Sequence, residues 1–168
     1  MPMNSFHDGA MLFIYGDNKV ESLGEAMEVF RSCSASLKYL EISDCDNLKS
    51  VVSGGLEHLS ALEELKIVCC DNLNESEEVE RVSFCQLTLL SLREMVEVPN
   101  WIQYLSALQT LHIDDCKKVE SMPNWMSKLT SVRELAVGCC SAQLKERCQE
   151  STGEDWPNIQ HIPDIGIS

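Results

Sequence analysis

The chain has 168 residues, 44% of them hydrophobic and 6% aromatic, and a formal net charge of −14. The length suits one domain, and the hydrophobic content argues against disorder. The negative charge repels phosphate backbones and anionic membranes, which argues against nucleic-acid binding and favours a partner with a basic surface.

The start of the chain contains no secretion signal, because Met1 to Gly9 has no basic segment followed by an apolar run. No apolar run approaches membrane-spanning length either, so we expect no insertion into membranes. Nine cysteines would leave one thiol unpaired in a secreted protein. We therefore expect free thiols in a reducing, cytoplasmic setting.

Residues 1–36 predict a degenerate first repeat with a short helix. Leu12 and Ile14 alternate as in a short strand, and apolar residues at helical spacing follow in residues 24–33. We find no segment suited to cover that first strand, so we expect its edge to be open.

Residues 37–143 hold a tandem repeat of the form leucine-x-x-leucine-x-isoleucine-x-x-cysteine, which three copies match in full and two match with substitutions. The copies start at Leu37, Leu62, Leu87, Leu108 and Val132, so the steps are 25, 25, 21 and 24 residues. These steps fit the period of roughly 20–29 residues that is typical of leucine-rich repeats.

Each part of the repeat has a structural reason. The Leu-x-Ile alternation places both side chains on one face of a short strand. The cysteine follows where the chain turns, and a thiol there can be buried and donate to a carbonyl group of the turn. Apolar residues at spacing three, before several copies, favour 3₁₀ turns. The sequence thus predicts an α/β leucine-rich-repeat solenoid, with about six short parallel strands on the concave face and irregular turns and short helices on the convex face.

Two segments depart from the period. Asp71 to Glu80 holds five acidic residues and predicts a solvated loop. Residues 144–168 predict a C-terminal cap, with a helical turn near Leu144–Cys148 and with Trp156, Ile159 and Ile162 covering the last repeat.

The repeat string, together with the Val98-Pro99 and Met122-Pro123 steps, resembles plant coiled-coil nucleotide-binding leucine-rich-repeat (NLR) disease resistance proteins. The tail, with Leu144–Cys148 and Gly153-Glu-Asp-Trp-Pro157, is similar to the extreme C terminus of that family. The resemblance implies a role in autoinhibition and in recognition of a pathogen effector or a guarded host protein. The chain lacks a phosphate-binding G-x-x-x-x-G-K-[ST] motif, so a stand-alone adaptor or decoy is the alternative.

Catalysis has no support in the sequence. No C-x-x-C, H-E-x-x-H or G-x-S-x-G motif occurs, so we expect no enzyme activity, no metal, no cofactor and no small-molecule substrate.

The candidate binding residues are the strand positions between and after the apolar ones, which should form contiguous rows on the concave face. Aromatic and arginine side chains in such rows are plausible anchors for a protein partner. Any short solenoid exposes a strip of this kind, so the sequence leaves open whether this strip binds. The candidates are Tyr39, Glu41, Glu64, Lys66, Arg93, His112, Asp114 and Glu134.

Overall fold

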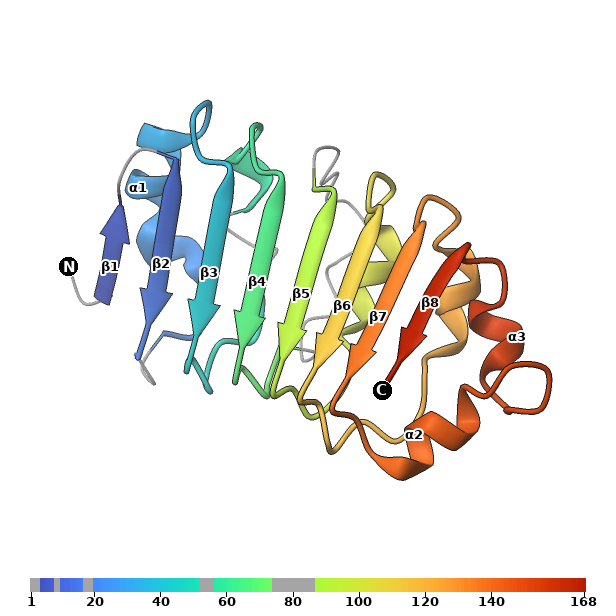
Figure 1. Cartoon of the computed structure of the whole chain (residues 1–168). Coiled ribbons are helices and arrows are strands. Elements are labelled where there is room, and N and C mark those ends of the chain that lie inside the picture. The colour runs from blue at the N-terminus through green and yellow to red at the C-terminus, as the bar shows by residue number, and fades with distance from the viewer. Residues whose placement is uncertain (1–3, 8–9, 17–19, 52–55, 74–86) are drawn as a thin grey trace.

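The structure is a computed structural model that describes residues 4–7, 10–16, 20–51, 56–73 and 87–168. Within these residues, eight strands form one sheet, and their order in space is their order in the chain (Figure 1). Strands β2 to β8 are parallel, and β1 is antiparallel to β2. The strands are β1 (Asn4–His7), β2 (Met11–Tyr15), β3 (Tyr39–Ser43), β4 (Glu64–Val68), β5 (Leu89–Arg93), β6 (Thr110–Asp114), β7 (Glu134–Gly138) and β8 (Asp164–Ile167).

The strands stack in register, which aligns the repeat strings in space as they align in sequence. The aligned apolar positions form two rows of aliphatic side chains beneath the sheet, each no more than 1% exposed. Burying one such side chain contributes about 1.5–3 kcal/mol. The first row is Leu12, Leu40, Leu65, Leu90, Leu111 and Leu135, and the second is Ile14, Ile42, Ile67, Leu92, Ile113 and Val137.

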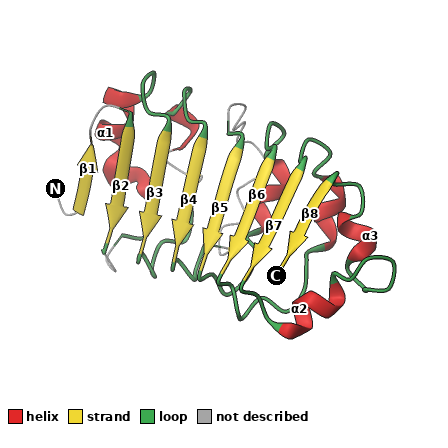
Figure 2. Ribbon diagram, viewed as in Figure 1, coloured by secondary structure: helices red, strands yellow, loops and turns green. Residues whose placement is uncertain are grey.

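Helical segments cover the core side of the sheet, as Figure 2 shows. The helix expected within residues 24–33 is confirmed as a 3₁₀ turn that runs into α1, which buries Phe30 and Cys33. That first turn is η1 (Leu23–Ala26), and α1 spans Met27–Cys33. The helical segments of the next repeats are 3₁₀ turns, as the spacing of three predicts: η2 (Leu56–His58), η4 (Asn100–Tyr104) and η5 (Asn124–Lys128).

The two Pro-Asn-Trp steps link successive repeats. Pro99 and Pro123 precede η4 and η5 in extended conformation, and the following tryptophans, Trp101 and Trp125, are 3% and 6% exposed. Trp125 Nε1 donates a hydrogen bond of 2.9 Å to Asn100 Oδ1 of the preceding repeat. Both tryptophans therefore belong to the hydrophobic core.

The chain leaves each strand through the same turn. The residue after the strand has a positive φ near 50° at Asp44, Cys69, Glu94, Asp115 and Cys139. A left-handed conformation costs a residue with a Cβ roughly 1–2 kcal/mol. The turn is retained because the N–H of the left-handed residue donates to the last carbonyl of the next strand, as Asp44 N does to Val68 O at 3.0 Å.

The repeat cysteines complete these turns. Cys45, Cys70 and Cys116 are buried, and each thiol donates to the carbonyl oxygen two residues earlier at 3.3 Å. The predicted role of the cysteine is therefore confirmed for these three. Cys140 is only partly buried and instead donates to Ser168 O at 3.7 Å.

The ends of the sheet differ from expectation. The prediction of an open edge at the first repeat strand is wrong, because β1 pairs with β2 from Asn4↔Tyr15 to His7↔Leu12. The count of about six parallel strands is too low by one, because β8 pairs with β7. The predicted loop from Asp71 to Glu80 lies mostly outside the described residues.

The C-terminal segment folds back over the last repeats. The expected helical turn near Leu144 is α2 (Ala142–Arg147), and α3 (Trp156–Ile159) contributes Ile159, which is fully buried. Between the two helices, the carboxylate of Asp155 is buried and accepts from Met122 N at 2.7 Å and from Arg147. This contact ties the tail to the turn that precedes η5. Among the described residues, no helix combines the length and apolarity that a bilayer crossing requires.

Candidate protein-binding surface

The sheet face opposite the helices is not covered by any other described element of the chain, and we call it the open face (Figure 1). The pairing register arranges its side chains in three rows, with neighbours about 4.8 Å apart. The first row is Met11, Tyr39, Glu64, Leu89, Thr110, Glu134 and Asp164; the second is Phe13, Glu41, Lys66, Ser91, His112, Ala136 and Gly166; the third is Tyr15, Ser43, Val68, Arg93, Asp114 and Gly138.

All eight candidate residues lie on these rows, but the structure groups them unequally. Tyr39, Glu41 and Lys66 form one cluster on β3 and β4. The Tyr39 hydroxyl donates to Glu41 Oε2 at 2.6 Å, and Lys66 Nζ lies 3.4 Å from Glu41 Oε1. Both carboxylate oxygens of Glu41 are therefore engaged within the cluster.

The cluster keeps Tyr39 neutral and fixed in orientation. Burial raises the pKa of the Tyr39 phenol, and the hydrogen bond to Glu41 and the charges of Glu41 and Glu64 raise it further. The Tyr39 ring also contacts that of Phe13, with centroids 5.6 Å apart and planes tilted by 49°. A tilted pair of this kind is a favourable aromatic geometry.

Glu64 lies beside Tyr39 on β4, and the other four candidates lie nearer the C-terminal half of the sheet. His112 Nε2 lies 3.3 Å from Glu134 Oε1, and both side chains are more than a third exposed. Arg93 turns towards the strand ends, where its guanidinium lies 3.3 Å from Asp115 Oδ2. The carboxylate of Asp114 lies over the neighbouring strand, because a Cβ on Gly138 would lie 2.6 Å from Asp114 Oδ1. Exposed pairs of this kind orient side chains more than they stabilise the fold.

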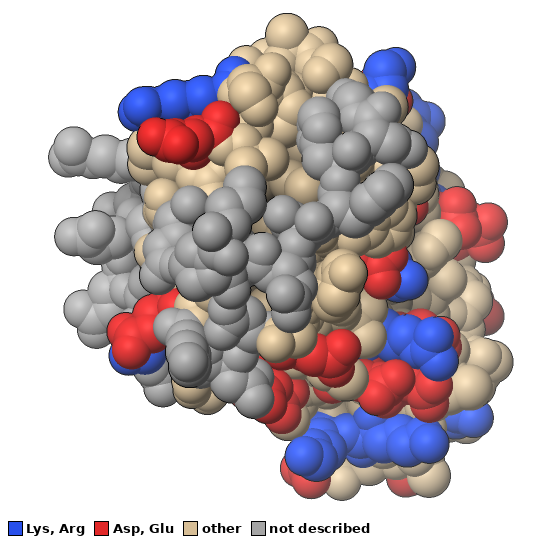
Figure 3. Space-filling model, turned by 90° about the vertical axis from the view of Figure 1, so that its left-hand side faces the viewer, with Lys and Arg blue, Asp and Glu red and all other residues tan. Residues whose placement is uncertain are grey.

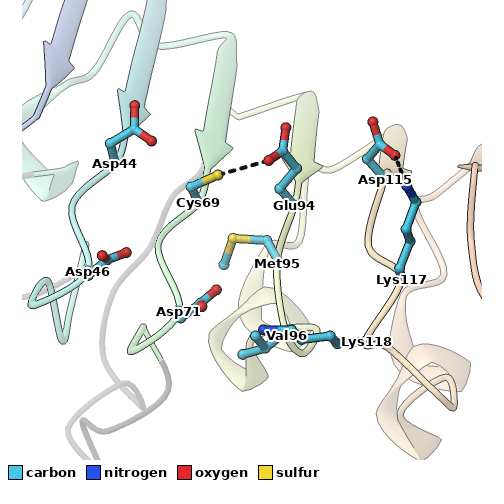
Figure 4. Close-up of a pocket in the computed structure, with 10 residues that line it drawn as sticks. All are labelled: Asp44, Asp46, Cys69, Asp71, Glu94, Met95, Val96, Asp115, Lys117 and Lys118. Atoms are coloured by element: carbon cyan, nitrogen blue, oxygen red, sulfur yellow. Dashed lines mark hydrogen bonds and ion pairs between the residues drawn. The ribbon is translucent and has the colours of Figure 1, made fainter.

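An acidic groove of about 600 Å³ borders the open face where the strands end (Figure 4). Cys69 donates to Glu94 Oε2 at 3.2 Å across the groove. Burial, the hydrogen bond to Glu94 and the charges of the nearby carboxylates together raise the pKa of the Cys69 thiol to about 11. The groove is lined by Asp44, Asp46, Cys69, Asp71, Glu94, Met95, Val96, Asp115, Lys117 and Lys118.

This groove was missed by sequence reasoning. Its residues follow the strands at the repeat period, so the signal was the recurrence of an acidic or small residue directly after each strand, as at Asp44, Glu94 and Asp115. Met11 was also missed, although it is 36% exposed and begins the first row of the open face.

The described part of the chain contains no group of three or more histidine, cysteine, aspartate or glutamate side chains placed to hold a metal ion. What the open face and its border offer is charge, hydrogen-bonding groups and exposed aromatic surface. A surface of this composition is suited to a protein partner. Seen from the β1 end in Figure 3, acidic and basic side chains also lie side by side among the described residues.

Comparisons with known proteins agree with this fold. No protein-family model matches the chain. The chain is 31% identical to the disease resistance protein RPP8 of Arabidopsis thaliana over 113 residues, which are 66% of this chain and 12% of that protein. It is 34% identical to the Arabidopsis disease resistance protein RPH8A over 85 residues, which are 49% of this chain and 9% of that protein. The chain thus matches only about a tenth of the length of these relatives.

Among solved structures, a leucine-rich-repeat protein of Leptospira interrogans superposes with a TM-score of 0.51 at 18% identity, over 84% of this chain and 39% of that one. At this identity the likeness concerns the fold alone. The repeat and the solenoid show that the chain is a leucine-rich-repeat region, and the curated proteins to which it is similar are plant disease resistance proteins.

Proposed function

We propose that this region binds a protein partner through its open face, as part of an intracellular plant immune receptor. In that role it would help to hold an upstream nucleotide-binding module inactive and would contact a pathogen effector or a guarded host protein, in the cytoplasm. Residues 37–143 would supply the binding surface, and residues 144–168 would cap it.

One observation carries this proposal. The three rows of the open face present ionisable and aromatic side chains at nearly every strand, although the fold uses only the opposite face for its core. Tyr39, Glu41 and Lys66 are in addition pre-arranged by mutual hydrogen bonds, so little side-chain freedom is lost when a partner binds. The names of the curated relatives, which are disease resistance proteins, supply the immune context.

The test uses a chimaera in which residues 37–168 replace the matching segment of Arabidopsis RPP8. Glu41, Glu64 and Asp114 are changed together to lysine, and cell death in leaves is followed by ion leakage. We expect the triple variant to change the response, either as constitutive death or as loss of triggered death.

The matched control changes three exposed carboxylates outside the open face, Glu28, Glu120 and Glu150, to lysine and thus adds the same charge. We expect this control to respond as the parent chimaera does. If both triple variants accumulate normally and give the parent response, the open face does not serve the receptor and the proposal is wrong.

The alternative function, a stand-alone adaptor or decoy, is favoured by one observation. β1 runs antiparallel along the edge of β2, in the position that the strand of a preceding repeat would take. A chain that keeps this pairing covers its own first strand. A monomeric, cooperatively unfolding chain in size-exclusion chromatography and circular dichroism would favour the adaptor. If the chain aggregated alone but stayed monomeric when fused to preceding repeats of a relative, the result would favour a segment of a longer receptor.

A further inference from the structure

Exposed apolar surface is concentrated at one corner of the open face. Among the described residues, the large hydrophobic side chains that are at least 36% exposed are Met11, Tyr15 and Tyr104. The first two lie on β2 and both point to the open face, on either side of Phe13. We call the set Met11, Phe13, Tyr15, Tyr39, Glu41 and Glu64 the aromatic corner.

The aromatic corner is ordered by contacts within the sheet. The register places Met11 beside Tyr39 and Tyr39 beside Glu64, and it places Phe13 beside Glu41. The ring contact of Phe13 with Tyr39 and the hydrogen bond from Tyr39 to Glu41 hold the central rings in place. Rigid aromatic side chains that are already positioned are typical anchors of protein interfaces.

The charges around the corner determine which partner it suits. The three rows of the open face hold five carboxylates, of Glu41, Glu64, Asp114, Glu134 and Asp164, against the cations of Lys66 and Arg93. Both cations already lie beside carboxylates of this chain: Lys66 beside Glu41, and Arg93 beside Asp115 and Glu94. Glu64 takes part in no ion pair with another described residue. The corner therefore has negative charge that an incoming cation would neutralise.

We infer that the aromatic corner binds a segment of a protein partner that presents an arginine or lysine next to an aliphatic residue. The cation would lie over the ring of Tyr39 and reach the Glu64 carboxylate beside it. The aliphatic side chain would cover Met11, and the segment would continue over Tyr15. Arginine fits better than lysine, because its planar guanidinium can stack on a ring and also pair with a carboxylate. This inference rests on the proposed function of the open face and specifies the chemistry of the partner there.

The alternatives are disfavoured by the same charges. A nucleic acid or an acidic peptide would bring further negative charge to a face that already carries an excess of carboxylates. A purely apolar segment would cover Met11 and the rings but would leave Glu64 without a counter-charge.

The test measures binding of labelled synthetic peptides to the full chain by fluorescence anisotropy at physiological ionic strength. The probe is a peptide in which arginine and leucine alternate. One comparison peptide has glutamate for arginine, and another has glycine for leucine with the same charge. We expect the arginine–leucine peptide to bind roughly tenfold more tightly than either, since both the charge and the apolar contact contribute.

Variants of the chain then locate the binding. Tyr15→Ala and the nearly isosteric Glu64→Gln should each weaken binding of the arginine–leucine peptide by about tenfold, the loss expected at an interface anchor. Two variants outside the open face serve as matched controls and should leave binding unchanged: Tyr104→Ala, which removes a similarly exposed tyrosine of η4, and Glu120→Gln. Unchanged circular dichroism spectra and melting temperatures show that the variants are folded.

Three results would overturn the inference: no binding of the arginine–leucine peptide, equal binding of the arginine–glycine peptide, or binding that is insensitive to both corner variants. These results are independent of the chimaera experiment. If one of them were obtained while the open-face triple variant still altered the cell-death response, the proposed function would stand and the aromatic corner would not be its anchor.

Discussion

Replacing Asp155 by alanine should loosen the C-terminal cap. The Asp155 side chain is 4% exposed, and its carboxylate accepts three hydrogen bonds: from Met122 N at 2.7 Å, from Arg147 Nε at 3.0 Å and from a terminal nitrogen of Arg147 at 2.8 Å. Without the carboxylate, the Met122 N–H is left buried without an acceptor, which costs about 1–3 kcal/mol. Since the contact with Arg147 is lost as well, we expect a destabilisation of about 3 kcal/mol, towards the upper end of that range.

The assay is urea unfolding followed by circular dichroism, together with hydrogen exchange of residues 144–168. The exchange should show loss of protection in α2, α3 and β8 before the central strands are affected. The control is Glu154→Ala, which removes another partner of Arg147 whose side chain is 75% exposed. It should change the stability by less than about 0.5 kcal/mol. If Asp155→Ala were as mild as this control, the cap would not depend on the buried carboxylate and our account of the tail would be wrong.

Three further predictions concern the turns and the thiols. Cys139→Gly should stabilise the chain by about 1 kcal/mol in urea unfolding, because glycine adopts the positive φ of 49° without strain; Cys139→Ala should not. Gly153→Ala should destabilise the cap, because a Cβ at that position would clash with the backbone carbonyl group of Arg147; normal melting of this variant would refute the close approach. Cys69 should react slowly with iodoacetamide at pH 7, because a pKa of about 11 leaves on the order of one thiol in ten thousand ionised. Its rate should rise about tenfold per pH unit below that pKa, and Glu94→Gln should accelerate it at pH 7; a rate at pH 7 equal to that of a free thiol would contradict this.

Much of the fold could be predicted because the repeat string encodes both the strand and its register. Leu40, Leu65 and Leu90 hold the same position in consecutive strings, and the structure places them side by side in one buried row. The same equivalence predicts which residues share a row of the open face. For this reason Tyr39 and Glu64, or Glu41 and Lys66, could be expected to be neighbours across strands.

The terminal strands could not be predicted in this way. β1 has no copy of the string, and its pairing depends on the edge of β2, which is a tertiary contact. β8 offers only Ile165 and Ile167 with a glycine between them, a pattern too short to distinguish a strand from a covering loop. In both cases the strand forms because a neighbouring edge offers unpaired backbone groups.

The contacts between side chains of the candidate site could not be predicted from the sequence either. The string places Arg93 on the open face, but the side chain turns to Asp115 and Glu94 at the strand ends. That choice depends on the left-handed turns after the strands, which bring Glu94 and Asp115 to the same border. A residue-by-residue pattern predicts the row of a side chain, whereas its partners follow from the three-dimensional arrangement of several turns.

The central claim, that the open face contacts a protein partner, is tested most directly by site-specific photo-crosslinking in the chimaeric receptor in leaf cells. The photoreactive residue is placed at Ser91 or Ala136, which lie in the middle row of the open face, or at Ser127 or Glu120, which lie outside it. We expect crosslinks to another protein, or to the nucleotide-binding part of the receptor, from the two open-face positions only. Crosslinks that form only from Ser127 or Glu120 would contradict the claim and would move the binding surface to the outer side of the solenoid.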